Sequence, residues 1–217
     1  MEYFRPIAMT DPARPPKAFT LAGGWCWFDR VEVLSRSAGP RVIPARDAPD
    51  DVLERLTAPR ADFAGLSMDR PRLMGILNVT PDSFSDGGRF SSIDAATKHG
   101  RQVAKTAEIL DIGGESTRPG AAEVQVATEI ARTTPVIEAL RAGGMRGPIS
   151  IDTRKAMVAI TAIRAGASVV NDVSGLEFDP ALGPLVAKEG VQLVLMHAQG
   201  LPLTMQDDPS YADVLLD

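Results

Sequence analysis

The sequence predicts an α/β protein built on a (β/α)8 barrel, the TIM-barrel type, preceded by a small β-rich N-terminal segment. The first observation behind this prediction is an alternation of apolar strand patterns with helical patterns that begins at Met74. The second is a polar residue or turn at the carboxyl end of each predicted strand. Barrel strands gather their carboxyl ends at one mouth, whereas an open sheet would leave them in a row, so this recurrence favours the barrel.

The N-terminal segment, residues 1–70, differs in composition from the barrel region, residues 71–217. Several prolines come first, and the aromatic and β-branched stretch at 19–34 then predicts strands. A short strand is expected at 42–43, and residues 47–57 predict a capped helix with apolar side chains on one side. The residues of this segment indicate no function.

The barrel region is expected to hold five strands joined by helices. The strands are short apolar runs, and the helices show apolar or small residues at helical spacing. The strands are expected at 73–78, 109–113, 149–152, 168–171 and 192–197, and helices at 93–105, 123–141 and 154–165. Gly143, Gly144 and Gly166 stand where helices should end. A closed barrel needs eight strands, so with about five βα units we expect an incomplete one.

The composition is that of a soluble globular protein. The chain has 217 residues, of which 44% are hydrophobic and 24% charged, and its net charge is -5. It has no apolar run of about 18 residues and no basic-then-apolar leader, which predicts a cytoplasmic protein that does not enter a membrane. The acidic balance argues against nucleic-acid binding. The lone Cys26 indicates packing rather than reactivity.

The first polar junction, Met74–Gly88, is a buried strand that ends on an amide and gives way to a small polar loop. Asn78 offers a carbonyl and an amide at the strand end, and Pro81 prevents the strand from continuing. Hydroxyls, carboxylates and two glycines follow. This pattern predicts a ligand-binding loop, although an ordinary βα turn is the alternative.

The second junction, Asp111–Gly120, adds a cation to the same pattern. Its paired glycines let backbone amides approach a ligand, Thr117 can donate a hydroxyl, and Arg118 can bind an oxyanion through two parallel hydrogen bonds. The alternative is a helix cap formed by Ser116 or Thr117, with Arg118 in solvent.

Two further strands end on groups that can bind a planar heterocycle. A buried carboxylate at Asp152 can accept two N–H groups from an amidine-like ring, and the Asn171 amide can both donate and accept. The alternative for Asp152 is a cap on the next helix. His197 is open between a base, a metal ligand and a structural residue, and no second histidine has plausible metal spacing.

At these residues the chain resembles dihydropteroate synthase, the folate-pathway family. Its two signatures match Met74–Gly88 and Asp111–Gly120, with supporting matches at 150–155, 170–175 and 195–200. The resemblance runs from about residue 73 to the end, and it departs at Ala198, where the family commonly has a larger residue. It implies a (β/α)8 barrel that joins dihydropterin-6-ylmethyl diphosphate to 4-aminobenzoate and releases diphosphate.

The resemblance also assigns roles. Asn78 would contact a diphosphate-bound Mg²⁺, and Arg118 with Mg²⁺ would stabilise the leaving group. Asp152 would stabilise charge that develops on the pterin. The pterin would be held by Thr117, Asp152 and Asn171, and the 4-aminobenzoate site, where sulfonamides compete, by Phe84, Thr117, Arg118 and Pro119. Asp86 would join the loop that closes over diphosphate.

The same family suggests a homodimer and a further set of site residues on later strands, none of which follows His197. We therefore expect a C-terminally truncated synthase with little activity. One alternative is the pterin-binding barrel of a folate-dependent methyltransferase, which the loops at 82–88 and 116–120 disfavour. The other is a catalytically silent pterin-binding protein.

Overall fold

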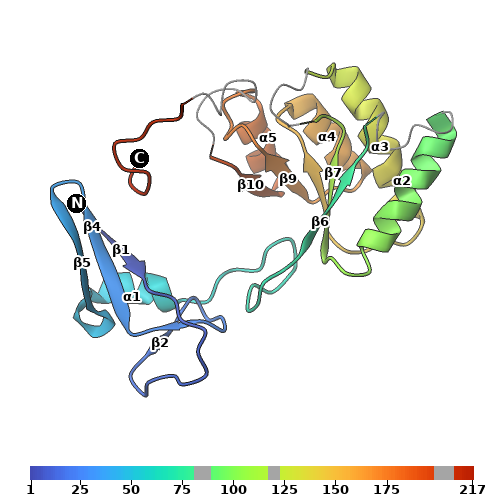
Figure 1. Ribbon diagram of the computed structural model, residues 1–217. Helices are drawn as coiled ribbons and strands as arrows, with labels where there is room; N and C mark the ends of the chain where they lie inside the picture. Colours follow the sequence, from blue (N-terminus) through green and yellow to red (C-terminus); the bar gives the residue numbers. More distant parts are fainter. Residues whose placement is uncertain (81–88, 117–122, 198–207) are drawn as a thin grey trace. The chain divides into compact units, whose positions relative to one another are not determined.

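The computed structural model describes residues 1–80, 89–116, 123–197 and 208–217. The chain divides into two compact units, Met1–Pro71 with Ser210–Asp217, and Arg72–Pro209 (Figure 1). The predicted α/β class is confirmed, with antiparallel strands first and a parallel sheet with helices after them.

The first unit is a small antiparallel β structure with one helix. Its sheet has the order β1-β4-β5, and a separate pair, β2 and β3, packs Phe19 against Phe28 with ring centroids 5.7 Å apart. The elements are β1 (Glu2–Pro6), β2 (Phe19–Thr20), β3 (Trp27–Phe28), β4 (Arg30–Ser35), β5 (Ala38–Pro44) and α1 (Asp50–Thr57).

The expected capped helix at 47–57 was wrong at its start. α1 begins at Asp50 with Pro49 as its N-cap, and no side chain caps it, because Asp47 belongs to the preceding 3₁₀ turn, Ala45–Asp47. Proline suits this boundary, since its fixed φ fits the entry to a helix and its missing N–H would have had no partner in the helix.

The second unit alternates strands and helices, as the sequence predicts. Its elements are β6 (Met74–Asn78), α2 (Arg89–Val103), β7 (Ile109–Gly113), α3 (Val126–Ala142), β8 (Ile149–Asp152), α4 (Ala156–Ala165), β9 (Val169–Asp172), α5 (Leu182–Glu189) and β10 (Gln192–Leu195). β10 ends at Leu195, so His197 lies beyond the strand. The short α5 was not among the expected helices. Gly143 and Gly166 are the C-caps of α3 and α4, and Gly166 has a φ of 116°.

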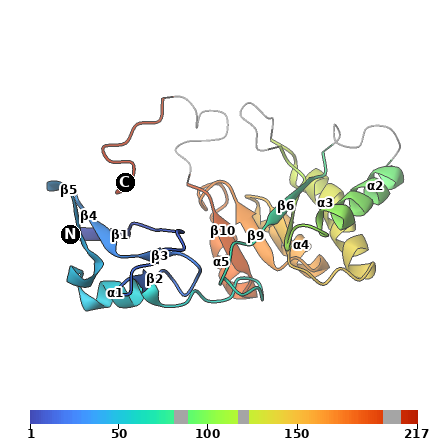
Figure 2. The same cartoon turned by 60° about the horizontal axis from the view of Figure 1, so that its bottom comes forward.

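The strand order distinguishes the two architectures left open by an alternating pattern. The five described strands are all parallel and follow chain order, β6-β7-β8-β9-β10, with no reversal among them. An open doubly wound sheet reverses its order at a switch point, whereas a barrel adds each strand beside the previous one. The described part of the sheet is therefore of the barrel type (Figure 2).

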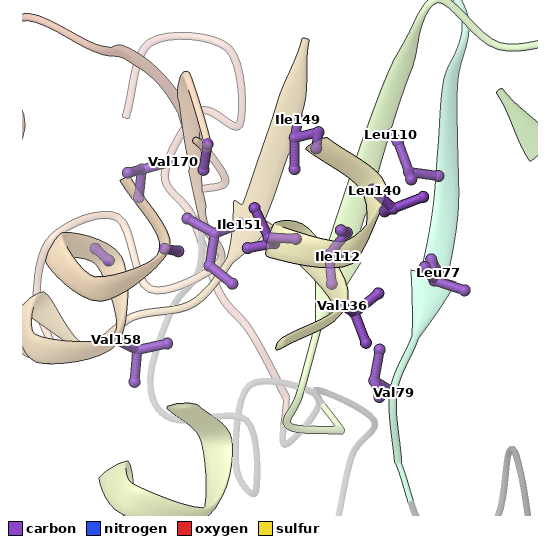
Figure 3. Packing of buried hydrophobic residues seen from close by; sticks show 14 of the residues in the cluster. Leu77, Val79, Leu110, Ile112, Val136, Leu140, Ile149, Ile151, Val158 and Val170 are labelled. Atoms are coloured by element: carbon purple, nitrogen blue, oxygen red, sulfur yellow. The ribbon is translucent and has the colours of Figure 1, made fainter. Parts of the chain in front are cut away.

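The hydrophobic core lies between the sheet and its helices (Figure 3). Alternate strand residues point to opposite faces, so one set meets the helices. That set is Leu77, Leu110, Ile112, Ile149, Ile151 and Val170, and it packs against α3 and α4 through Val136, Ile137, Leu140, Val158, Ala159 and Ala162. Each large side chain buried here contributes roughly 1.5–3 kcal/mol. The opposite face, which we call the inner face, is left to the residues between them.

Gly75 shows how closely β6 packs on α2. A Cβ there would lie 2.2 Å from Val103 Cγ1 and 2.9 Å from Ala107 Cβ, too close for either atom to remain in place.

We expect Gly75→Ala to lower the free energy of unfolding by about 1–3 kcal/mol through overpacking, measured by urea denaturation. The matched control is Gly39→Ala, whose Cβ would meet nothing within 4 Å. Equal stability of the two variants would contradict this packing.

Candidate active site

Four strands bring one inner-face residue each to the same level at the carboxyl edge of the sheet. Asn78 pairs in register with Gly113, Gly113 with Asp152, and Asp152 with Asn171. We call these four residues the carboxyl-edge row. Three strand-end side chains that are far apart in sequence therefore lie side by side, with the glycine between the first two.

Gly113 leaves an opening between two oxygens. A Cβ at this position would lie 3.4 Å from Asn78 Oδ1 and 3.4 Å from Asp152 Oδ2, so both side chains flank the space above the glycine. Any larger residue would fill that space. The row thus places the Asn78 amide oxygen on one side of the Gly113 backbone and an Asp152 carboxylate oxygen on the other.

The carboxyl group of Asp152 has a raised pKa. Burial raises the pKa of its carboxyl group to about 7, and the neighbouring charges of Asp111, Glu129, Glu115 and Asp172 add to the rise. Its Oδ1 is buried and has no hydrogen-bond partner among the residues that the structure describes. A strongly perturbed carboxyl group with an unused acceptor is typical of binding and catalytic sites.

Asn171 is held by a second buried carboxylate. Its Nδ2 donates a hydrogen bond to Oδ2 of Asp111, with 3.1 Å between the two atoms. Asp111 lies on the inner face of β7, two residues before Gly113, and is only 4% exposed. Burial raises the pKa of Asp111, and the Ser150 hydroxyl and the Asn171 amide oppose the rise.

Behind the row lies a buried ion network, formed by Glu115, Glu129, Arg154 and Lys155. Lys155 Nζ lies 2.8 Å from Glu129 Oε2 and 3.2 Å from Glu115 Oε1. Arg154 Nε lies 3.4 Å from Glu115 Oε2. The four residues are at most 8% exposed, and Glu129 is fully buried, so two carboxylates and two cations compensate one another inside the protein.

This network also fixes the backbone around the carboxyl end of β7. Glu115 Oε1 accepts a hydrogen bond from the Val124 backbone N–H at 2.7 Å, and Lys155 Nζ donates to the Val124 carbonyl at 2.5 Å. Burial opposes ionisation of Glu115, but the Val124 N–H, Arg154 and Lys155 together lower its pKa. Glu115 and Val124, which flank the interval 116–123, are thereby tied to each other and to the end of β8.

The comparisons with known proteins agree with this geometry. Residues 74–217 match the profile of a family described as pterin binding enzyme. That match covers well over half of the chain.

The chain belongs to the pterin-binding enzyme family.

Several of the proteins that it resembles are named dihydropteroate synthase. The protein of Synechocystis sp. is 48% identical over 147 residues, which are 67% of this chain and 50% of that protein. The Xanthomonas albilineans enzyme, solved with 4-aminobenzoic acid, is 50% identical with a TM-score of 0.63, over 72% of this chain and 56% of that one. The Yersinia pestis enzyme, in a sulfonamide drug complex, is 47% identical with a TM-score of 0.61, over 69% and 54%. The chain spans about half the length of each of these three relatives.

The structure places three of the expected site residues together, namely Asn78, Asp152 and Asn171 in the carboxyl-edge row. Their individual roles in this family stay predictions. The other expected site residues lie outside the described part of the chain, and they are Phe84, Asp86, Thr117, Arg118 and Pro119. Ala198, the departure from the family pattern, also lies outside it. His197 is exposed, and its role stays open.

The helix-cap alternative for Asp152 was wrong. α4 has Lys155 as its N-cap and no side-chain cap, and the Ala156 N–H in its first turn donates instead to Asp179 Oδ2 at 2.8 Å. Asp152 is therefore not occupied as a cap. α3 begins only at Val126, so Ser116 is too far back along the chain to cap that helix, while Thr117 and Arg118 lie outside the described residues.

Sequence reasoning missed Asp111 and the buried ion network. Asp111 had a recognisable signal, because a charged residue two positions before Gly113 in an otherwise apolar strand must share its face. The network had no such signal. Glu129 lies within a helix that carries other charged residues, and only the packing of α3 beside α4, whose N-cap is Lys155, brings it to Lys155.

The row contains donors that suit a small divalent cation. Asn78 Oδ1 and Asp152 Oδ2 are hard oxygen donors on either side of Gly113, the donor type that Mg²⁺ prefers. Within the described ranges, no group of three or more His, Cys, Asp or Glu residues is placed to bind a metal. Mg²⁺ commonly takes one or two protein ligands and fills its shell with phosphate oxygens and water, so Asn78 fits that mode.

Among the residues that the structure describes, no helix is both long and apolar enough to cross a membrane.

The raised pKa of Asp152 predicts that the free energy of unfolding depends on pH. Its folded-state pKa of about 7 lies above its ordinary value, so the neutral acid is favoured by the fold and stability is lost as pH rises from about 4 to about 7. Asp152→Asn removes this loss. We expect the variant to gain about 2–4 kcal/mol relative to the parent chain between pH 4.5 and pH 8, measured by urea denaturation. Asp179→Asn is the matched control, and an equal gain there would contradict the assignment.

The buried ion network predicts a large effect of removing its central cation. Lys155→Met leaves Glu115 and Glu129 buried without that charge, and we expect a loss of about 3–5 kcal/mol in the free energy of unfolding. The comparison is Arg55→Met, which breaks an exposed pair with Asp51 and should cost less than about 1 kcal/mol. Chemical denaturation of both variants decides this, and similar losses would show that the network contributes no more than a surface pair.

Proposed function

We propose that this chain provides the pterin-binding side of a dihydropteroate synthase site, which joins dihydropterin-6-ylmethyl diphosphate to 4-aminobenzoate and releases diphosphate. The observation that carries the proposal is the carboxyl-edge row, in which Asn78, Asp152 and Asn171 share one level of the sheet. A diphosphate-bearing pterin presents both a planar ring with N–H donors and an anionic tail. The names of the matched relatives support this reading.

Asp152 and Asn171 would hold the ring. Adjacent acceptors at strand ends match the adjacent N–H groups of an amidine-like heterocycle, and Asp152 Oδ1 is an acceptor with no partner among the described residues. Near neutral pH, a carboxyl group with a pKa of about 7 titrates readily. Donors or positive charge from a bound ring would favour its ionised form, so ligand and carboxylate would stabilise each other.

The reaction needs no nucleophile from the protein. The amine nitrogen of 4-aminobenzoate attacks the pterin methylene carbon, the carbon–oxygen bond to diphosphate breaks, and the amine loses a proton. Ionised Asp152 would stabilise the electron-poor pterin, and Arg118 would bind the departing anion. Mg²⁺ held at Asn78 would neutralise charge on the diphosphate. Phe84, Thr117, Arg118 and Pro119 would receive 4-aminobenzoate, and Asp86 would lie near diphosphate.

Several finer properties belong to the same proposal. They are the use of Mg²⁺, a cytoplasmic location, a homodimer, and the assignment of residues 71–217 to the pterin-binding domain. The names of matched structures with 4-aminobenzoic acid and with a sulfonamide drug support a site for 4-aminobenzoate and its competitors. The role of the N-terminal unit stays open.

Calorimetry and a steady-state assay on the 217-residue chain test the proposal. We expect dihydropterin-6-ylmethyl diphosphate to bind in the presence of Mg²⁺, and turnover with 4-aminobenzoate to be slow, because the five described strands form only part of a barrel mouth. Asn171→Leu should weaken binding about tenfold or more, since it removes a polar partner of the ring. Gln192→Leu, at the amino end of β10, is the control and should bind normally.

Each outcome separates the candidates. Absence of pterin binding would contradict the proposed site, and rapid turnover would contradict the expectation of low activity. Pterin binding without any consumption of 4-aminobenzoate would favour the silent pterin-binding protein or the methyltransferase module instead.

A further inference from the structure

Asp111 is a buried charge in a place where strands are normally apolar. It stands between Leu110 and Ile112 in β7, a strand whose five residues are all buried. Its Oδ1 has no hydrogen-bond partner among the described residues, so its burial lowers stability. With 4% exposure, Asp111 is not positioned to contact a ligand directly.

The contact of Asp111 that leads toward the site is its bond to Asn171. The register pairs Asp111 with Ser150 and Asn171 with Asp152, so the Asn171 side chain reaches diagonally across β8 to meet the carboxylate. Nδ2 of Asn171 and Oδ2 of Asp111 are 3.1 Å apart. A residue of the carboxyl-edge row is thus held by a residue one level below it.

The chemistry of this pair fixes the direction of the amide. An ionised carboxylate only accepts hydrogen bonds, whereas an amide has one end that donates and one that accepts. The amide nitrogen must therefore face Asp111. This leaves the Asn171 carbonyl oxygen as the acceptor available to the site, whereas an amide in place of Asp111 would accept either orientation.

We propose that Asp111 is a positioning residue, which holds the Asn171 amide so that its carbonyl oxygen is presented to an N–H of the bound heterocycle. The inference rests on the proposed pterin-binding function and extends it. Asp111 would set which heterocycles are accepted, favouring rings that donate at that edge over rings that do not. It would do so through Asn171 and without touching the ligand.

The test compares the affinities of two probes. These are 6-hydroxymethylpterin and its 2-deamino analogue, which lacks the exocyclic amine, and both are titrated calorimetrically into the 217-residue chain. We expect the parent chain to prefer the pterin by about tenfold, and Asp111→Asn, which keeps the shape, to reduce that preference several-fold. Asp179→Asn makes the same chemical change at a helix-capping carboxylate, and it should leave the preference unchanged.

A second measurement needs no ligand. In the ¹⁵N-labelled chain, the Asn171 side-chain amide should show one N–H that exchanges slowly with water, and Asp111→Asn should abolish that protection. A merely structural role would lower stability without changing either the preference between probes or this signal.

The outcomes are distinct. An unchanged preference in Asp111→Asn, with pterin binding intact, overturns the inference and leaves the proposed function standing. Absence of pterin binding by the parent chain overturns the proposed function, and with it the proposed role of Asp111 in selecting heterocycles. If the Asn171 side-chain N–H of the parent chain exchanges rapidly with water, the positioning role of Asp111 is overturned, regardless of the affinities for the two probes.

Discussion

The ammonium group of Lys155 lies between two buried carboxylates, and the arrangement of the site depends on that contact. Glu115 follows the end of β7, Lys155 follows the end of β8, and Glu129 projects from α3 behind them. Buried charges are stabilising only when their partners are in place, because the cost of removing them from water is large. The network therefore tolerates little displacement of these strand ends, and it holds Gly113 and Asp152 at a fixed separation.

The carboxyl-edge row gains its chemistry from groups that lower stability. Asp111 and Asp152 are both buried, both lack a partner for one oxygen among the described residues, and the charge of Asp111 raises the pKa of Asp152. Such crowding of like charges has no structural benefit of its own. The apolar layer between the sheet and its helices, together with the ion network, supplies the stability that this cluster lowers. A bound cationic or N–H-bearing ring would relieve the same crowding.

Much of the fold was predictable because its signals are local. The five strands follow from apolar runs, and the end of α4 follows from Gly166, whose positive φ is a conformation that glycine adopts easily. The start of α1 and the existence of α5 were not predictable, since short helices have weak residue patterns and neither helix has a side-chain N-cap that would mark its start. Of the site, the strand-end residues Asn78, Asp152 and Asn171 were recognised, but their common register was not. The links from Asp179 to α4 and from Glu129 to Lys155 depend on tertiary packing, which a pattern of residue types does not encode.

In the proposed function, the carboxyl-edge row forms the pterin-binding surface. This role is tested most directly by titrating 6-hydroxymethylpterin into the ¹⁵N-labelled chain and mapping the changes in backbone amide resonances. The account predicts the largest changes at Asn78, Gly113, Asp152 and Asn171, and none in residues 1–71. Changes centred on the helix-covered face or on the N-terminal unit would contradict it.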